Sequence, residues 1–180
     1  MTRRTTSKAE RRLIWLGSAF TVLLVLFAFS RLANDGAALV AADLNGVTLS
    51  TLDGEKTVDL GKCKTEKCLT VYVSPWCGIC RKSTPFINEL KGYLIRKNID
   101  TRIVVGRGQA DQVREYAPAF GPDVLLDMSA AYPLQGGVPN FAVSNSKGEV
   151  VKVVPGVPGI WTPPFPEALM VKMGDYLGLF

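Results

Sequence analysis

WCGIC, at residues 76–80, is the stretch that decides the fold of this chain. The apolar run LTVYV at residues 69–73 precedes it and predicts a buried strand, and residues 81–97 follow it and predict a helix. Two cysteines in C-x-x-C spacing also occur in zinc sites. A strand, a Trp, C-x-x-C and a helix in this order are instead typical of a redox pair, here Cys77 and Cys80.

Cys77 is the predicted nucleophile of this pair. A cysteine at a helix N-terminus feels the positive end of the helix dipole and loses its proton more easily. The thiolate is the attacking species in disulfide exchange, and Cys80 is expected to be less exposed and to resolve the mixed disulfide. The sequence contains no His, so the usual Ser-His and Cys-His nucleophile pairs are excluded.

The N-terminal segment predicts a membrane anchor. Residues 1–12 carry five basic residues and one acidic residue, and residues 13–29 form a run of 17 without charge. This length is at the short end of what spans a bilayer, and preceding positive charge places the N-terminus in the cytoplasm. We therefore expect a cytoplasmic basic tail at residues 1–12 and a transmembrane signal-anchor at residues 13–30. A cleaved signal peptide is the alternative, because Val40-Ala41-Ala42 resembles a cleavage site.

The remaining chain divides into a tether and one domain. Residues 31–45 are rich in Ala and are expected to be the tether, and residues 46–180 the domain, located in the periplasm or outside the cell. Of the formal net charge of +5, the first 12 residues contribute +4. The nearly neutral remainder has no electrostatic footprint for nucleic acid.

Strands and helices alternate along the predicted domain. Two short strands are expected around Asp53-Gly54, and further strands at residues 99–105 and 124–127. A helix is expected at residues 109–120, a helical turn at 130–134, a hairpin at 140–154 and a closing helix at 167–179. Pro85 should kink the helix after Cys80 or start a second helical segment. This order implies an α/β fold with a mixed central sheet and helices on both faces.

The chain resembles the thioredoxin fold, and more narrowly the membrane-tethered TlpA/ResA-like thiol–disulfide oxidoreductases of bacterial envelopes. Three motifs over about residues 43–178 carry the resemblance: LNGVTLSTLDGE at 44–55, SPWCGIC at 74–80, and GGVPNFAV at 136–143 followed by NSKGEVV at 145–151. In this family the proline of the third motif is cis and faces the cysteine pair, so Pro139 is the matching residue. The long interval between Cys80 and Pro139 fits the inserted helix and strand of the TlpA/ResA group.

The residues around the cysteine pair have further predicted roles. The backbone of Val138 would offer hydrogen bonds to a bound substrate segment, beside Pro139. Trp76 would give partner proteins an apolar platform. Alternatively, Trp76 is an aromatic residue of the hydrophobic core. Gly78 would keep the loop open, and Ile79 would tune the reduction potential. Relatives often carry a buried acid six residues before the first cysteine, where this chain has Val71.

The motif CKTEKC at residues 63–68 is not part of the family pattern. Cys63 and Cys68 form either a structural disulfide or a second redox pair that passes electrons to Cys77 and Cys80. Four thiolates could also bind zinc. The predicted strand between Cys68 and Cys77 argues against a zinc site, because an extended strand would hold these two cysteines roughly 20–30 Å apart.

We therefore expect a protein disulfide oxidoreductase that needs neither a metal ion nor another cofactor. Its partners would be thiol- or disulfide-bearing envelope proteins and a membrane redox partner. The tether and the insertion favour a reductant, whereas Val138 before the proline resembles disulfide-forming oxidases of the DsbA type. A non-catalytic metal-delivery or assembly factor of thioredoxin fold is the other alternative.

Overall fold

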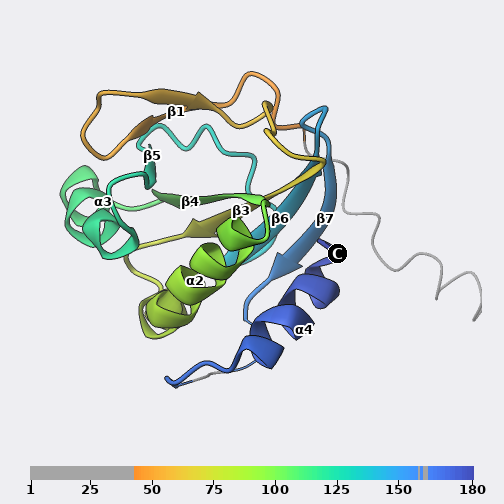
Figure 1. Ribbon diagram of the computed structural model, residues 1–180. Coiled ribbons are helices and arrows are strands. Elements are labelled where there is room, and N and C mark those ends of the chain that lie inside the picture. The colour runs from red at the N-terminus through yellow and green to blue at the C-terminus, as the bar shows by residue number, and fades with distance from the viewer. Residues whose placement is uncertain (1–42, 158, 160–161) are drawn as a thin grey trace, which may run out of the picture. The chain divides into compact units, whose positions relative to one another are not determined.

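The computed structural model describes residues 43–157, 159 and 162–180 (Figure 1). The expected basic tail, the membrane span and residues 31–42 of the tether lie outside the described residues. Within the part of the chain that is described, no helix combines the length and the hydropathy that crossing a bilayer requires.

The strands and helices follow the order expected from the sequence. They are β1 (Thr48–Thr51), β2 (Thr57–Asp59), β3 (Lys67–Val73), α2 (Gly78–Arg96), β4 (Asp100–Gly106), α3 (Ala110–Tyr116), the 3₁₀ helix η1 (Ala117–Phe120), β5 (Leu125–Asp127), β6 (Asn140–Asn145), β7 (Val150–Pro155) and α4 (Glu167–Leu177).

One seven-stranded mixed sheet organises the domain, in the strand order β2-β1-β5-β4-β3-β6-β7. β3 runs parallel to β4 and antiparallel to β6, and β4 runs parallel to β5. The predicted mixed α/β sheet is therefore confirmed. β3 lies between two neighbours and is buried along almost its whole length, which explains why its sequence is a continuous apolar run.

The described helices cover one face of the sheet, not both faces as expected. Side chains from α2, α3, η1 and α4 belong to a single core cluster, and Figure 1 shows α2 and α4 side by side. A second cluster on the opposite face contains Leu44, Leu60 and Tyr132, which come from loops. The strand order explains this arrangement, because β3, β4 and β5 lie next to one another in the sheet. The connections from β3 to β4 and from β4 to β5 therefore run in the same direction across the sheet. Since such connections are right-handed, their helices α2 and α3 lie on the same face.

Two local expectations also differ from the structure. Pro85 lies inside α2 without starting a second helix, because the buried residues Phe86, Ile87 and Leu90 pack this segment against the core. Residues 130–134 contain no helical turn. Instead the Asp127 carboxylate accepts hydrogen bonds from the backbone N–H groups of Ala131 (2.8 Å) and Tyr132 (3.2 Å).

The last residues of the expected tether contact the domain. Asp43 forms a β-bridge with Glu149, and the Leu44 N–H donates to the Gly148 carbonyl oxygen at 3.1 Å. Leu44 has no exposed surface. Packing thus begins before residue 46, because the turn between β6 and β7 accepts a hydrogen bond from Leu44 and the core cluster that contains Leu60 and Tyr132 buries its side chain.

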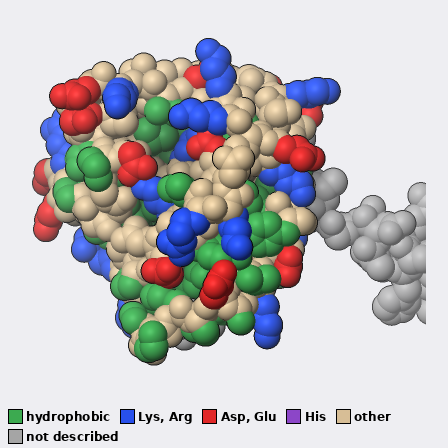
Figure 2. All heavy atoms as spheres, viewed as in Figure 1, with side chains coloured by type: hydrophobic (Ala, Val, Ile, Leu, Met, Phe, Trp, Pro, Cys, Tyr) green, Lys and Arg blue, Asp and Glu red, His purple; other side chains and the backbone are tan. Residues whose placement is uncertain are grey.

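Charged side chains of both signs are interspersed on the face of the domain drawn in Figure 2. This mixture agrees with the small net charge of the chain after residue 12. Such a surface gives no strong long-range attraction to a polyanion.

Alkaline pH is expected to destabilise the fold. Burial, together with the neighbouring Asp127 carboxylate, raises the pKa of Tyr72, and burial raises the pKa of Tyr132. Both phenols are therefore held neutral, and their contribution to stability is complete below the unfolded-state pKa of about 10 and is lost above it. Urea titrations at pH 8 and pH 11 should give a lower free energy of unfolding at pH 11, with a smaller decrease for Tyr72→Phe. An equal decrease in the two proteins would contradict this assignment.

Candidate active site

The junction between β3 and α2 positions Cys77. β3 ends at Val73, and the Ser74 carbonyl oxygen accepts a hydrogen bond from the Cys77 N–H at 3.1 Å. Cys77 is the N-cap of α2, with an extended backbone, and its Sγ accepts a hydrogen bond from the Cys80 N–H at 3.1 Å. The helix begins at Gly78, three residues before the expected start, because Cys77 itself supplies this cap.

Cys77 and Cys80 form a disulfide. Cys77 is 6% exposed and Cys80 has no exposed surface. The first turn of α2 contains no acidic residue. A thiolate at Cys77 would therefore meet the positive helix end and an oriented N–H group without a nearby negative charge on the same turn.

The loop before β6 faces this disulfide. The peptide bond between Val138 and Pro139 is cis, as the resemblance implied. The Val138 carbonyl oxygen lies 3.5 Å from Cys77 Sγ, so the third motif meets the second in space. Pro139 is buried, and its carbonyl oxygen accepts a hydrogen bond from the Gly156 N–H at 2.6 Å. This bond ties the loop to the end of β7.

Exposed apolar side chains surround Cys77. Trp76 is 64% exposed and Ile79 is 50% exposed, so Trp76 is not a core aromatic. The Trp76 Nε1–H donates a hydrogen bond to the Arg107 carbonyl oxygen, which fixes the indole at the edge of the site. A Cβ at Gly78 would meet nothing within 4 Å. The fold itself therefore does not require glycine at position 78.

Arg81 supports the cysteine loop from the helix side. Its Nε–H donates to the Pro75 carbonyl oxygen at 2.7 Å, and its guanidinium lies 5.0 Å from the centre of the Tyr116 ring. The Tyr116 and Thr84 hydroxyls are 2.9 Å apart, and burial raises the pKa of Tyr116. The ring thus stays neutral beneath the cation, and a positive charge is held one helical turn from Cys77.

Sequence reasoning missed a buried carboxylate near the ends of the strands. Val71 is 1% exposed and packs in the cluster that contains Cys77 and Cys80, so no acid lies at that position. Asp127, at the end of β5, is 2% exposed and accepts a hydrogen bond from the Tyr72 hydroxyl at 2.9 Å. Tyr72 belongs to the cluster on the opposite face of the sheet. Asp127 therefore does not replace the acid that relatives carry at the position of Val71. Its position at the end of a predicted strand could have identified it as a buried carboxylate.

Cys63 and Cys68 form a second disulfide. Cys68 is fully buried near the start of β3, whereas Cys77 follows the end of the same strand. The four cysteines therefore do not gather around one ion. Among residues 43–157, 159 and 162–180, no group of three or more His, Cys, Asp or Glu side chains is arranged to hold a metal ion.

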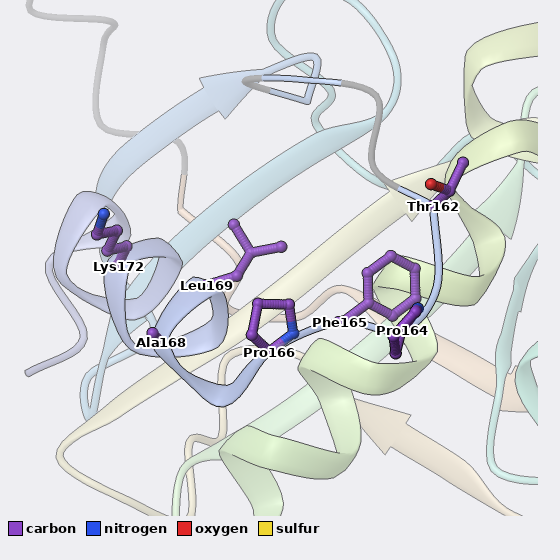
Figure 3. Close-up of a pocket in the computed structure, with 7 residues that line it drawn as sticks. All are labelled: Thr162, Pro164, Phe165, Pro166, Ala168, Leu169 and Lys172. Atoms are coloured by element: carbon purple, nitrogen blue, oxygen red, sulfur yellow. The ribbon is translucent and has the colours of Figure 1, made fainter.

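A hollow of about 450 Å³ lies where the segment after residue 161 enters α4 (Figure 3). It is lined by prolines, Phe165, Leu169 and Lys172, and by no cysteine or acid. Phe165 packs edge-on against Phe86 of α2, with ring centres 5.8 Å apart. The residues that line this hollow therefore have no part in the site around Cys77 and Cys80.

Gly108 is expected to be required for the position of the cysteine loop. A Cβ at residue 108 would lie 2.4 Å from Pro75 Cγ and 3.0 Å from Pro75 Cδ. Because the proline ring is rigid, Gly108→Ala should displace Pro75 and with it the start of α2. We expect disulfide exchange about tenfold slower, since a displacement of about 1 Å at a reacting group is costly. Insulin reduction monitored by turbidity measures the rate, and an unchanged rate in the folded variant would contradict the expectation.

Comparisons with known proteins show the fold. No family model matches the chain, and no curated protein is similar enough in sequence to match. Solved structures do match. The exposed lipoprotein thioredoxin of Streptococcus pneumoniae is 22% identical over 76% of this chain and 100% of its own, with a TM-score of 0.54. The thioredoxin domain of a Bacteroides vulgatus thiol-disulfide oxidoreductase is 15% identical over 76% and 96%, with a TM-score of 0.51.

A third match is a thiol:disulfide interchange protein of the thioredoxin family from Chlorobium tepidum. It is 18% identical over 78% of this chain and 99% of its own, with a TM-score of 0.50. These similarities confirm that the described domain has the thioredoxin-like α/β fold predicted from the sequence.

Proposed function

We propose that this protein is a thiol–disulfide oxidoreductase that exchanges disulfides with partner proteins through Cys77 and Cys80. The observation that carries the proposal is the convergence of two elements on one sulfur. Cys77 Sγ caps α2 by accepting the Cys80 N–H, and it lies 3.5 Å from the carbonyl oxygen that precedes Pro139. The names of the structural neighbours, which include thiol-disulfide oxidoreductases and interchange proteins, support the same activity.

In the reducing direction, the Cys77 thiolate attacks one sulfur of a partner disulfide. A mixed disulfide forms, and the second partner sulfur leaves as a thiolate that takes a proton from solvent. The Cys80 thiolate then attacks Cys77 Sγ, which closes the Cys77–Cys80 disulfide and releases the first partner sulfur. Two electrons pass from the protein to its partner, and the reverse sequence oxidises a dithiol.

The exposed side chains around Cys77 are the proposed substrate-binding surface. Trp76 supplies an apolar platform that Arg107 holds in place, and the Val138 carbonyl oxygen can accept a backbone N–H from an extended partner segment. Pro139 keeps this carbonyl beside the sulfur. Gly78 leaves room for the partner backbone, and Ile79 tunes the potential because it offers the thiolate no hydrogen bond.

We place this activity in the bacterial cell envelope. Residues 13–30 would anchor the chain as a single span, with the N-terminus in the cytoplasm and the catalytic domain in the periplasm or outside the cell. Its partners would be thiol- or disulfide-bearing envelope proteins and a membrane redox partner. The second disulfide, between Cys63 and Cys68, is consistent with an oxidising compartment.

The direction of electron flow is testable through the reduction potential. We favour a reductant, and an oxidase of the DsbA type is the alternative. The full-length chain would be equilibrated with thiol–disulfide buffers, and the redox state of the peptide containing Cys77 and Cys80 read by alkylation and mass spectrometry. A potential near −270 mV is expected for a reductant, whereas a value near −120 mV would identify an oxidant.

A further inference from the structure

We propose that Cys63–Cys68 is a second exchangeable disulfide, attacked at Cys63 by a thiol-bearing partner, with Arg102 and Ser144 receiving the departing Cys68 thiolate. This assignment does not depend on the function of Cys77 and Cys80. It differs from a purely structural disulfide in one respect: the site is built to hold the reduced state as well as the oxidised one.

Access distinguishes the two sulfurs of this disulfide. Cys63 is partly exposed and lines a groove of about 630 Å³ between β2 and the start of β4, whereas Cys68 has no exposed surface. Disulfide exchange requires the nucleophile to approach one sulfur along the bond, so only Cys63 can be attacked in the folded protein. Cys68 is therefore the leaving sulfur.

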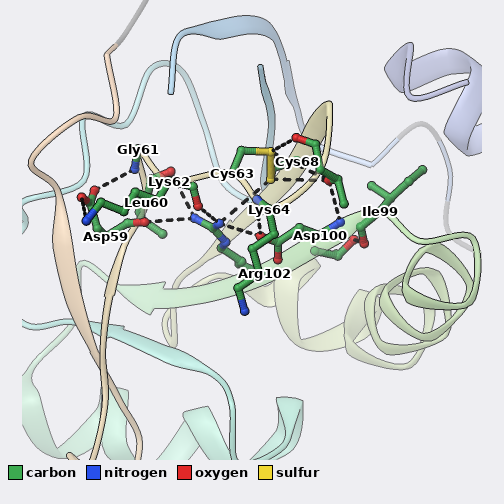
Figure 4. Close-up of polar contacts among 12 residues, drawn as sticks. Asp59, Leu60, Gly61, Lys62, Cys63, Lys64, Cys68, Ile99, Asp100 and Arg102 are labelled. Atoms are coloured by element: carbon green, nitrogen blue, oxygen red, sulfur yellow. Dashed lines mark hydrogen bonds and ion pairs between the residues drawn. A yellow bond between two sulfur atoms is a disulfide. The ribbon is translucent and has the colours of Figure 1, made fainter. Parts of the chain in front are cut away.

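A buried cation lies beside the leaving sulfur. Arg102 is 8% exposed, and its Nη2 lies 4.0 Å from Cys68 Sγ (Figure 4). The guanidinium is held by an ion pair with Asp100 at 2.6 Å and by hydrogen bonds to the backbone carbonyl oxygens of Leu60 (3.1 Å) and Lys62. Both N–H groups of Nη2 donate to Asp100 and Lys62, so Arg102 is already oriented and would stabilise a Cys68 thiolate through its positive charge. A lower-energy leaving thiolate accelerates exchange.

Two buried hydroxyl groups share this face of the sheet. Ser144 pairs directly with Cys68 across β3 and β6, and Thr70 is the next residue of β3 on the same face. Ser144 has no exposed surface and Thr70 is 1% exposed, yet neither hydroxyl has a hydrogen-bond partner. A disulfide sulfur is a weak acceptor, whereas a thiolate is a strong one. The Ser144 hydroxyl makes no hydrogen bond to sulfur in the oxidised state, and after reduction a Cys68 thiolate on the neighbouring strand would offer it a strong acceptor.

The proposed exchange proceeds in two steps. A partner thiolate bonds to Cys63 Sγ, the Cys63–Cys68 bond breaks, and its electron pair stays on Cys68 Sγ. A second thiolate of the partner then attacks the partner sulfur of the mixed disulfide, and Cys63 leaves and takes a proton from solvent. The partner dithiol is oxidised by two electrons and the protein disulfide is reduced. β3 separates this pair from Cys77 by roughly 20–30 Å, so each pair meets its own partner.

The experiment uses the full-length Cys77→Ser/Cys80→Ser chain, in which Cys63–Cys68 is the remaining disulfide. Reduction by dithiothreitol without denaturant is followed by alkylation and mass spectrometry. We expect a rate proportional to thiol concentration, insensitive to low urea, with circular dichroism unchanged after reduction. A rate that rises with urea as steeply as global unfolding does would overturn the proposal, because reduction would then require unfolding.

Substitutions test the residues assigned to the leaving sulfur. Ser144→Ala removes a hydroxyl without a folded-state partner and should slow reduction several-fold, and Arg102→Gln should slow it about tenfold. Ser50→Ala on the exposed side of β1 is the matched control and should reduce at the parent rate. If the Arg102→Gln variant does not fold, the reduction rate of the Ser144→Ala variant is the test of the proposal. A folded Ser144→Ala chain with the parent rate would overturn the role of Ser144.

Discussion

The Cys77→Ser variant is expected to reduce insulin about a thousandfold or more slowly, because no other sulfur in the described site is both accessible and placed at a helix N-terminus. Serine preserves the N-cap hydrogen bond to the Cys80 N–H, so the loss should come from the missing nucleophile and not from unfolding. Insulin reduction by the full-length chain measures the rate, and urea unfolding checks the fold.

Cys80→Ser is the matched variant for the second step. It leaves Cys77 free to attack but removes the resolving sulfur, so mixed disulfides with partner proteins should accumulate. Non-reducing electrophoresis of envelope extracts, followed by mass spectrometry, identifies the cysteine that is linked. If variants of Cys80 trapped nothing and only a Cys63 or Cys68 variant trapped partners, the assignment of Cys77 as the principal nucleophile would be wrong.

Gly106→Ala should destabilise the domain by about 3 kcal/mol, which is large for the addition of one methyl group. A Cβ at residue 106 would lie 2.2 Å from the Tyr72 hydroxyl oxygen and 2.9 Å from the Asp127 carbonyl oxygen. The Tyr72 ring cannot simply move away, since it is fully buried, stacks on Tyr132 at 4.8 Å and hydrogen-bonds to Asp127. Urea unfolding monitored by circular dichroism gives the free energy of unfolding.

Gly92→Ala is the control for this prediction. Residue 92 lies inside α2, and its Cβ would meet only Arg96 Nη1, at 3.5 Å. Here alanine should stabilise the domain by about 0.5–1 kcal/mol through its higher helix propensity. Tyr72→Phe combined with Gly106→Ala should recover part of the loss, since one clashing atom is removed. A Gly106→Ala protein as stable as the parent would show that β4 and β5 can separate at no cost.

Local patterns in the sequence predicted the strand and the helix that flank Cys77 and Cys80. β3 was recognisable because a strand buried on both sides must be apolar at successive positions, and α2 because the apolar residues after Cys80 recur at helical spacing. The Val138–Pro139 motif came from family resemblance. Periodicity alone does not predict that Val138 lies beside Cys77, because the two are distant in sequence. The antiparallel pairing of β6 with β3 brings them together.

Expectations failed where a tertiary contact replaced a local preference. The sequence predicted a helical turn at residues 130–134, but the Asp127 carboxylate accepts hydrogen bonds from two backbone N–H groups of this segment. Helices on both faces were expected from alternation alone, but the strand order places those described on one face. The spacing of residues in the sequence predicts neither which group accepts a backbone hydrogen bond nor the order of the strands in the sheet.

The sequence by itself determined the residues on which the proposed chemistry depends: two cysteines between a buried strand and a helix, in a chain without histidine. Only the tertiary structure decided what surrounds each sulfur. The sheet brings the Val138 carbonyl oxygen to Cys77, and it brings Arg102 and Ser144 to Cys68. These neighbours come from other strands and their loops, and the hydrogen-bonded register between strands fixes them.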